Sequence, residues 1–126
     1  MTNNDTITEA GKILTDECYG LSKAAGWWSD IDTGKPKERN VCEMLCLIHS
    51  EVSEALEGYR KNLMDDKMPH RKLMETELAD AVIRIFDMAG GLGLDVAGAI
   101  AEKLEYNKKR EDHKLENRLK DGGKKF

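Results

Sequence analysis

The chain has 126 residues, of which 40% are hydrophobic and 35% are charged, and its formal net charge is −4. This length predicts a single domain with a short tail, and the composition excludes both a disordered chain and a membrane protein. We expect a cytoplasmic protein, because no secretory signal is visible and the three cysteines form no Cys-x-x-Cys motif.

The charges are unevenly distributed. Residues 1–100 carry 11 basic and 18 acidic side chains, whereas residues 101–126 carry 9 basic and 6 acidic ones. An acidic body argues against a binder of nucleic acid polymers. It is compatible with a small phosphate ligand that is held by metal on one side and by Lys or Arg on the other.

The pattern predicts an all-α fold, because Val and Ile together number only 11 and no segment alternates with a period of two. The first helix is predicted from about residue 6 to about residue 25, with Thr6 or Thr8 as its N-cap and Gly26 as its end. A loop with Trp27 and Trp28 follows. We expect these tryptophans either to stack on a nucleotide base or to pack in the hydrophobic core.

Three further helices are predicted at about residues 40–62, 71–89 and 95–110. Residues 65–70 form a polar break, and we expect the third helix to end at the glycines Gly90, Gly91 and Gly93. Asp95 is expected to cap the fourth helix. We divide the chain into an all-α domain, residues 1–110, and a basic C-terminal tail, residues 111–126, which ends in a loose segment.

Two pairs of carboxylates stand on helix faces that ought to be buried. On the second helix, Glu51 falls inside the apolar arc and Glu54 at its edge. The third helix is apolar around most of its circumference, and its charged residues form one stripe: Glu77, Asp80, Arg84 and Asp87. Grouped carboxylates need a cation, and oxygen ligands favour Mg²⁺, Mn²⁺ or Ca²⁺. The alternative is an ordinary solvated face in which Arg84 pairs with Asp80 or Asp87; Arg84 touching substrate is a further alternative.

The segments Glu51-Val-Ser-Glu54 and Glu77-Leu-Ala-Asp80 resemble the Glu-x-x-Glu and Glu-x-x-Asp signature of the MazG-like all-α nucleoside triphosphate pyrophosphatases. Other matching segments are Arg39-Asn40, Lys103-x-x-x-Asn107-x-x-Arg110 and the tail Gly122-Gly123-Lys124, which is similar to that of phage and mobile-element members. The chain departs from this pattern in residues 111–121, which lengthen the link to the tail, and at Asp121, where a basic residue or His is expected.

The resemblance implies a four-helix bundle completed by homo-oligomerisation, as a dimer or a dimer of dimers. It implies a Mg²⁺-dependent hydrolase that cleaves a nucleoside triphosphate between its α- and β-phosphates into monophosphate and pyrophosphate, with Mn²⁺ as a substitute metal. Glu51, Glu54, Glu77 and Asp80 would then hold the metal.

We expect Glu51 or Glu54 to accept the proton of the attacking water. Lys103, Asn107 and Arg110 share a helix face and would hold the phosphates, unless they form a solvated basic face. Two other functions remain open: an inactive helical dimerisation module of the same fold, and a pyrophosphohydrolase of another substrate such as phosphoribosyl-ATP.

Overall fold

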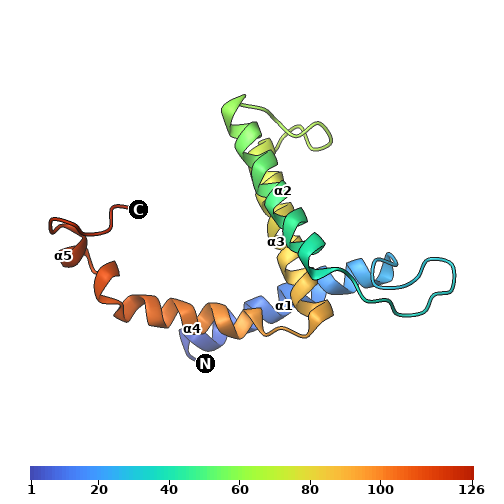
Figure 1. Ribbon diagram of the computed structural model, residues 1–126, viewed down its shortest axis with the longest axis horizontal. Coiled ribbons are helices and arrows are strands. Elements are labelled where there is room, and N and C mark those ends of the chain that lie inside the picture. Colours follow the sequence, from blue (N-terminus) through green and yellow to red (C-terminus); the bar gives the residue numbers. More distant parts are fainter. The chain divides into compact units, whose positions relative to one another are not determined.

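A computed structural model describes residues 1–126. The chain is all-helical, with only two isolated β-bridges and no strand, which confirms the predicted all-α class (Figure 1). The four-helix bundle and its completion by homo-oligomerisation stay predictions. It divides into two compact units. One comprises Leu14–Leu94, and the other comprises Met1–Ile13 together with Asp95–Phe126. The boundary that we placed at residue 110 stays a prediction.

Helix α1 spans Asn3–Ala24 and begins earlier than predicted. Its start is capped by Thr2, whose hydroxyl oxygen accepts a hydrogen bond from the backbone N–H of Asp5 at 3.1 Å, while the Asp5 carboxylate accepts one from the N–H of Thr2 at 3.0 Å. The predicted N-caps Thr6 and Thr8 are therefore wrong. Both hydroxyls instead donate to carbonyls four residues earlier, as is usual within a helix.

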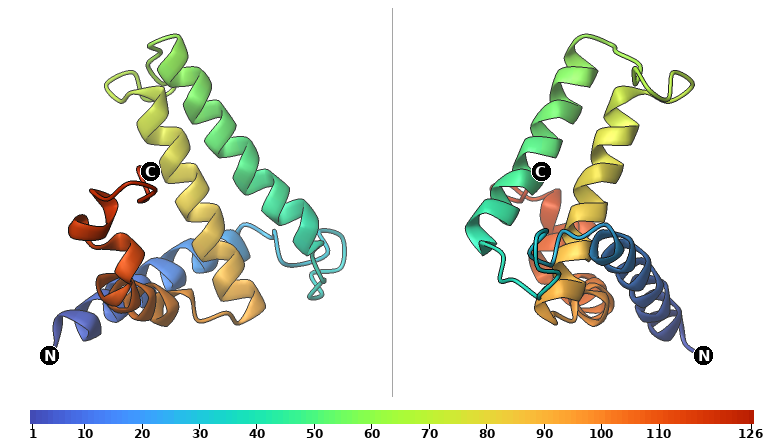
Figure 2. Two further views of the ribbon diagram at one scale, coloured as in Figure 1. Left: turned by 60° about the vertical axis from the view of Figure 1, so that its left-hand side comes forward. Right: turned by 90° about the vertical axis from the view of Figure 1, so that its right-hand side faces the viewer.

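Helices α2 (Val41–Arg60) and α3 (Leu73–Leu92) form an antiparallel hairpin and lie side by side in both views of Figure 2. Asn40 caps α2, because its side-chain oxygen accepts a hydrogen bond from the N–H of Glu43 at 3.0 Å. The connection between the two helices, residues 61–72, contains the predicted polar break at residues 65–70. This pairing of α2 with α3 brings their two acidic motifs to one place.

The end of α3 differs from the prediction, because the helix continues through Gly90 and Gly91 and ends only at Gly93, which has a φ of 68°. A Cβ atom at Gly90 would lie 2.5 Å from Cβ of Tyr19, and one at Gly91 would overlap the ring of Trp28. These two glycines therefore allow aromatic side chains to pack against the helix. Only the third glycine acts as a helix end.

The core of the Leu14–Leu94 unit is small. Its buried apolar residues are Trp28, Met44, Ala55, Ala81, Phe86 and Ala89, and no large side chain anywhere in the chain is fully buried. Several large apolar side chains of the hairpin remain about half exposed, among them Val52, Leu56, Leu78, Val82 and Ile83. The hairpin thus leaves apolar surface uncovered within a single chain.

The other unit contains α4 (Val96–Lys109), a short 3₁₀ turn (Glu111–His113) and α5 (Leu115–Arg118). Asp95 caps α4 as predicted, since its carboxylate accepts a hydrogen bond from the N–H of Gly98 at 2.9 Å. The final residues form no helix, but the expectation of a loose segment needs correction. The Arg118 guanidinium donates to the carbonyls of Lys124 and Lys125, both at 3.1 Å.

Candidate functional site

Three of the four predicted carboxylates meet between α2 and α3. Oxygen atoms of Glu51, Glu77 and Asp80 all lie within 4.8 Å of one another. Glu51 is only 8% exposed, whereas Asp80 is open to solvent. Because Glu77 and Asp80 are three residues apart on one helix, they share a face, and the hairpin places Glu51 opposite that face. We refer to these three residues as the acidic trio.

The charges of the acidic trio are not balanced. The Oε2 atom of Glu77 is buried and has no hydrogen-bond partner. The adjacent carboxylate of Glu51, with which a protonated Glu77 would share a hydrogen bond, raises the pKa of Glu77 to about 8, together with burial and the neighbouring carboxylate of Glu54. Burial and the charge of Glu51 also raise the pKa of Asp80, although the nearby Arg84 acts in the opposite direction. When all three carboxylates are ionised, the trio therefore holds more negative charge than Arg84 neutralises.

A divalent cation would fit this arrangement. Carboxylate oxygens are the ligands that Mg²⁺, Mn²⁺ and Ca²⁺ prefer, and the buried Oε2 of Glu77 offers a ligand atom that accepts no hydrogen bond from the chain. Glu54, the fourth predicted ligand, is exposed and lies outside the trio, although it is close enough to affect the pKa of Glu77. Its role as a ligand stays a prediction.

Arg84 has a different partner from the two that the sequence predicted. Its Nε donates to Oε1 of Glu51 at 3.0 Å, and it forms no ion pair with Asp80 or Asp87. The side chain reaches from α3 across to α2, a contact that the charge stripe on a single helix could not indicate. Arg84 therefore neutralises part of the acidic trio.

Asp87 is already engaged by two other residues. Its Oδ1 accepts a hydrogen bond from the indole N–H of Trp28 at 2.8 Å, and its Oδ2 lies 3.6 Å from a guanidinium nitrogen of Arg39. The Arg39 guanidinium also stands 4.9 Å from the centroid of the Trp28 ring. An edge-on contact with Tyr19, with ring centroids 5.7 Å apart, completes the surroundings of Trp28. These contacts support the structural alternative for Trp28.

An open cleft of about 680 Å³ adjoins the acidic trio, within the range of small-molecule sites. Two of the trio, Glu51 and Asp80, line it, together with two arginines, Arg39 and Arg84. Its remaining walls are mainly apolar and include Leu21, Leu47, Ile83 and the 63% exposed Trp27. The stacking of Trp27 on a base stays a prediction. The cleft thus combines carboxylates, guanidinium groups and an apolar wall.

Our sequence reasoning overlooked Arg39 and Leu21 as residues of this cleft. Arg39 entered only as part of the segment before the second helix, and Leu21 had no assigned role. The presence of Arg39 in the same predicted loop as Trp27 and Trp28 was a signal, because guanidinium groups stack on aromatic rings. No periodicity indicated that residues of α1 would line the cleft, because that depends on contacts between distant segments.

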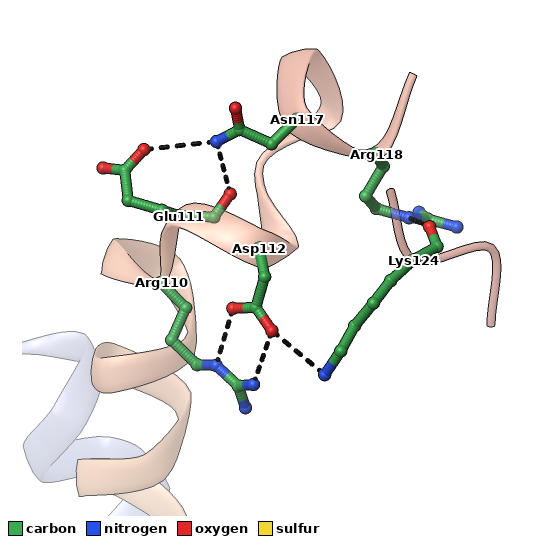
Figure 3. A network of polar contacts seen from close by, with 6 residues as sticks. All are labelled: Arg110, Glu111, Asp112, Asn117, Arg118 and Lys124. Carbon is green, nitrogen blue, oxygen red and sulfur yellow. Dashed lines mark hydrogen bonds and ion pairs between the residues drawn. The ribbon is translucent and has the colours of Figure 1, made fainter. Parts of the chain in front are cut away.

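Of the predicted phosphate-binding residues, Lys103 and Asn107 lie on α4 and Arg110 directly follows its last residue, all in the other unit. Arg110 is engaged by Asp112, whose carboxylate accepts hydrogen bonds from Nε at 3.1 Å and from a terminal nitrogen at 2.8 Å. The same carboxylate lies 3.0 Å from Nζ of Lys124 (Figure 3). Together these two cations hold the pKa of Asp112 well below its usual range.

The other two members of this group are less engaged. Nζ of Lys103 lies 5.0 Å from the centroid of the Tyr106 ring, and Oδ1 of Asn107 is buried without a hydrogen-bond partner. The interaction of Arg110 with Asp112 was not predicted, although the two residues are only two positions apart in the sequence. Phosphate binding by Lys103, Asn107 and Arg110 stays a prediction.

Comparison of the chain with protein-family models, curated proteins and solved structures gives no match. No helix combines the length and apolar character needed to cross a bilayer. The function must therefore be inferred from the acidic trio and its cleft.

Proposed function

We propose that the chain is a Mg²⁺-dependent nucleoside triphosphate pyrophosphohydrolase of the MazG-like type, which cleaves between the α- and β-phosphates and releases a monophosphate and pyrophosphate. The observation that carries this proposal is the acidic trio, in which Glu51, Glu77 and Asp80 crowd together and one Glu77 oxygen is buried without a partner. The motif spacing that resembles this family supports the same assignment.

Glu51, Glu77 and Asp80 would hold the metal, with Glu54 as the predicted fourth ligand. Mg²⁺ bound there supplies a positive charge for phosphate oxygens and lowers the pKa of a coordinated water. Without such a cation, a triphosphate would be repelled by the carboxylates of the trio, because the triphosphate itself carries several negative charges at neutral pH.

Among the carboxylates, Glu54 is the better candidate for the group that accepts the proton of the attacking water. Glu51 is buried and already accepts a hydrogen bond from Arg84, whereas Glu54 is exposed and makes no ion pair. A general base must stay free to take up a proton within reach of the water. Glu54 forms no ion pair that would prevent it from taking up a proton. Its influence on the pKa of Glu77 indicates that it lies beside the trio.

The apolar wall of the cleft would take the base or sugar of the nucleotide. Trp27 offers an exposed aromatic face, and Leu21 and Ile83 add apolar surface. Apolar walls with a few charged groups are typical of nucleotide-sized ligand sites. This wall does not specify which base is preferred.

A second copy of the chain would cover the apolar surface of the hairpin. Val52, Leu56, Leu78 and Val82 are 45–58% exposed in the single chain. Such surface is costly in water, and a symmetric dimer is the commonest way to bury it. Sedimentation equilibrium should therefore give a mass of two or four chains, and a monomer at micromolar concentration would contradict this part of the proposal.

The test of the proposed reaction is an assay with Mg²⁺ and each ribo- and deoxynucleoside triphosphate, with products separated by ion-exchange chromatography. We expect monophosphate and pyrophosphate from at least one substrate. The matched control is Glu57→Gln, which alters a half-exposed carboxylate of α2 outside the trio. Release of diphosphate and phosphate would show that the wrong bond was assigned, and no product with Mg²⁺ or Mn²⁺ would favour the inactive dimerisation module.

A further inference from the structure

Arg84 uses only one of its five N–H donors within the chain. Its Nε donates to Glu51 at 3.0 Å, and neither terminal nitrogen makes a hydrogen bond. The side chain is 40% exposed and lines the cleft beside the acidic trio. A guanidinium offers its donors in a planar fork that matches the oxygens of a phosphate. Arg84 therefore retains a binding capacity that the fold does not use.

The second arginine of the cleft, Arg39, is in a different situation. Its guanidinium is only 18% exposed, lies 3.6 Å from Asp87 and stands over the ring of Trp28. These contacts commit Arg39 to the loop that packs against α3. Of the two arginines in the cleft wall, Arg84 is thus the one available to a ligand.

The position of Glu51 explains how Arg84 is oriented. Glu51 is only 8% exposed, so its carboxylate has little freedom to move and fixes the position of Nε of Arg84. In the empty cleft, Arg84 offsets part of the charge of the trio. Once a divalent cation is bound by the trio, less negative charge faces Arg84, and the guanidinium becomes a better partner for an anionic oxygen.

We propose that Arg84 binds a phosphate oxygen of the ligand beside the acidic trio, with Glu51 holding its guanidinium in place. This inference rests on the proposed function, since it takes the ligand to be a polyphosphate. It makes Arg84 a substrate-binding residue of the cleft rather than only a partner of Glu51.

The experiment measures two bindings in the same set of variants. Electron paramagnetic resonance gives the affinity for Mn²⁺ alone, and calorimetry gives the affinity for inorganic pyrophosphate with and without Mn²⁺. The variants are Arg84→Met, which removes the charge, and Arg84→Lys, which keeps a charge near Glu51 but loses the fork. Arg60→Met is the matched control, because Arg60 is an exposed arginine of α2 that pairs only with Glu57.

We expect both Arg84 variants to bind Mn²⁺ at least as well as the unmodified protein. Their affinity for pyrophosphate should fall about ten- to hundredfold, the range for lost charge-assisted hydrogen bonds. The Arg60→Met variant should match the unmodified protein in both measurements. Circular dichroism of each variant establishes that the helices are retained.

Unchanged pyrophosphate affinity in both Arg84 variants would overturn the inference. A parallel loss of Mn²⁺ and pyrophosphate binding would also overturn it, because Arg84 would then serve only to position Glu51. If pyrophosphate binding depends on Arg84 but no nucleotide is hydrolysed, the inference stands and the proposed reaction fails. If the unmodified protein binds neither probe, both fail.

Discussion

The indole N–H of Trp28 donates a hydrogen bond to Oδ1 of Asp87 at 2.8 Å, across 59 positions of the sequence. This bond joins the loop after α1 to the last turns of α3. It also leaves Asp87 in contact with Arg39, so one carboxylate organises both the aromatic side chain and the guanidinium. The loop that forms one wall of the cleft is thereby attached to the helix that carries Glu77 and Asp80.

Replacing Trp28 with Phe should therefore destabilise the protein. The substitution removes the hydrogen bond to a carboxylate and part of a buried ring, and we expect a loss of about 2 kcal/mol or more and a fall in Tm of several degrees. The control is Trp27→Phe, because Trp27 is 63% exposed. Equal thermal unfolding of the two variants would show that the bond to Asp87 does not stabilise the fold.

Two glycine substitutions should have opposite effects on stability. Gly91→Ala places a Cβ atom within the ring of Trp28, so the loop must move and the free energy of unfolding should fall by about 1–3 kcal/mol. Gly20→Ala lies in α1 with no heavy atom within 4 Å of the new Cβ, and it should stabilise the protein by about 0.5–1 kcal/mol. Urea denaturation measures both, and a loss of stability in Gly20→Ala would contradict the packing described for α1.

The stability of the metal-free protein should fall as the pH rises from about 4.5 to about 8. Glu77 has a pKa of about 8 in the folded protein against an ordinary value of 4.5, so the folded state binds a proton that the unfolded state has released. The stabilising proton is fully present below the lower value and is lost as the pH passes the higher one. Tm measured in EDTA between pH 5.5 and 8.5 tests this, and Glu77→Gln should flatten the curve in that window.

Metal binding should show the converse dependence. A cation requires ionised carboxylates, so its binding releases the proton of Glu77 and becomes stronger as the pH rises towards 8. The increase in Tm caused by Mg²⁺ should therefore be larger at pH 8.5 than at pH 6. An increase that is the same at both pH values, or larger at pH 6, would argue against Glu77 as a ligand.

Either Glu54→Gln or Asp80→Asn should abolish Mg²⁺-dependent turnover while the helix content stays intact. Asp80→Asn removes one carboxylate of the trio and Glu54→Gln removes one beside it, and both side chains are exposed, so folding should not depend on them. Turnover is measured as pyrophosphate release and helix content by circular dichroism. Normal turnover in Glu54→Gln would exclude it as general base, and normal turnover in Asp80→Asn would remove it from the metal site.

Local sequence was enough to predict the four long helices and the three residues of the acidic trio. Apolar periodicity and caps such as Asn40 and Asp95 act over a few residues, so they can be recognised without knowledge of the rest of the chain. The spacing of Glu77 and Asp80 on one helix face is likewise a local property, because three residues make nearly one turn.

Contacts between distant segments decided the end of α3 and the partner of Arg84, which local rules predicted wrongly. Gly90 and Gly91 were predicted to end α3, but the packing of Tyr19 and Trp28 requires them inside the helix. Arg84 was assigned a partner on its own helix, but the hairpin brings Glu51 within 3.0 Å of it. A side chain's partners depend on which helices pack together, and that pairing is settled by burial of apolar surface across the whole unit, which no window of neighbouring residues contains.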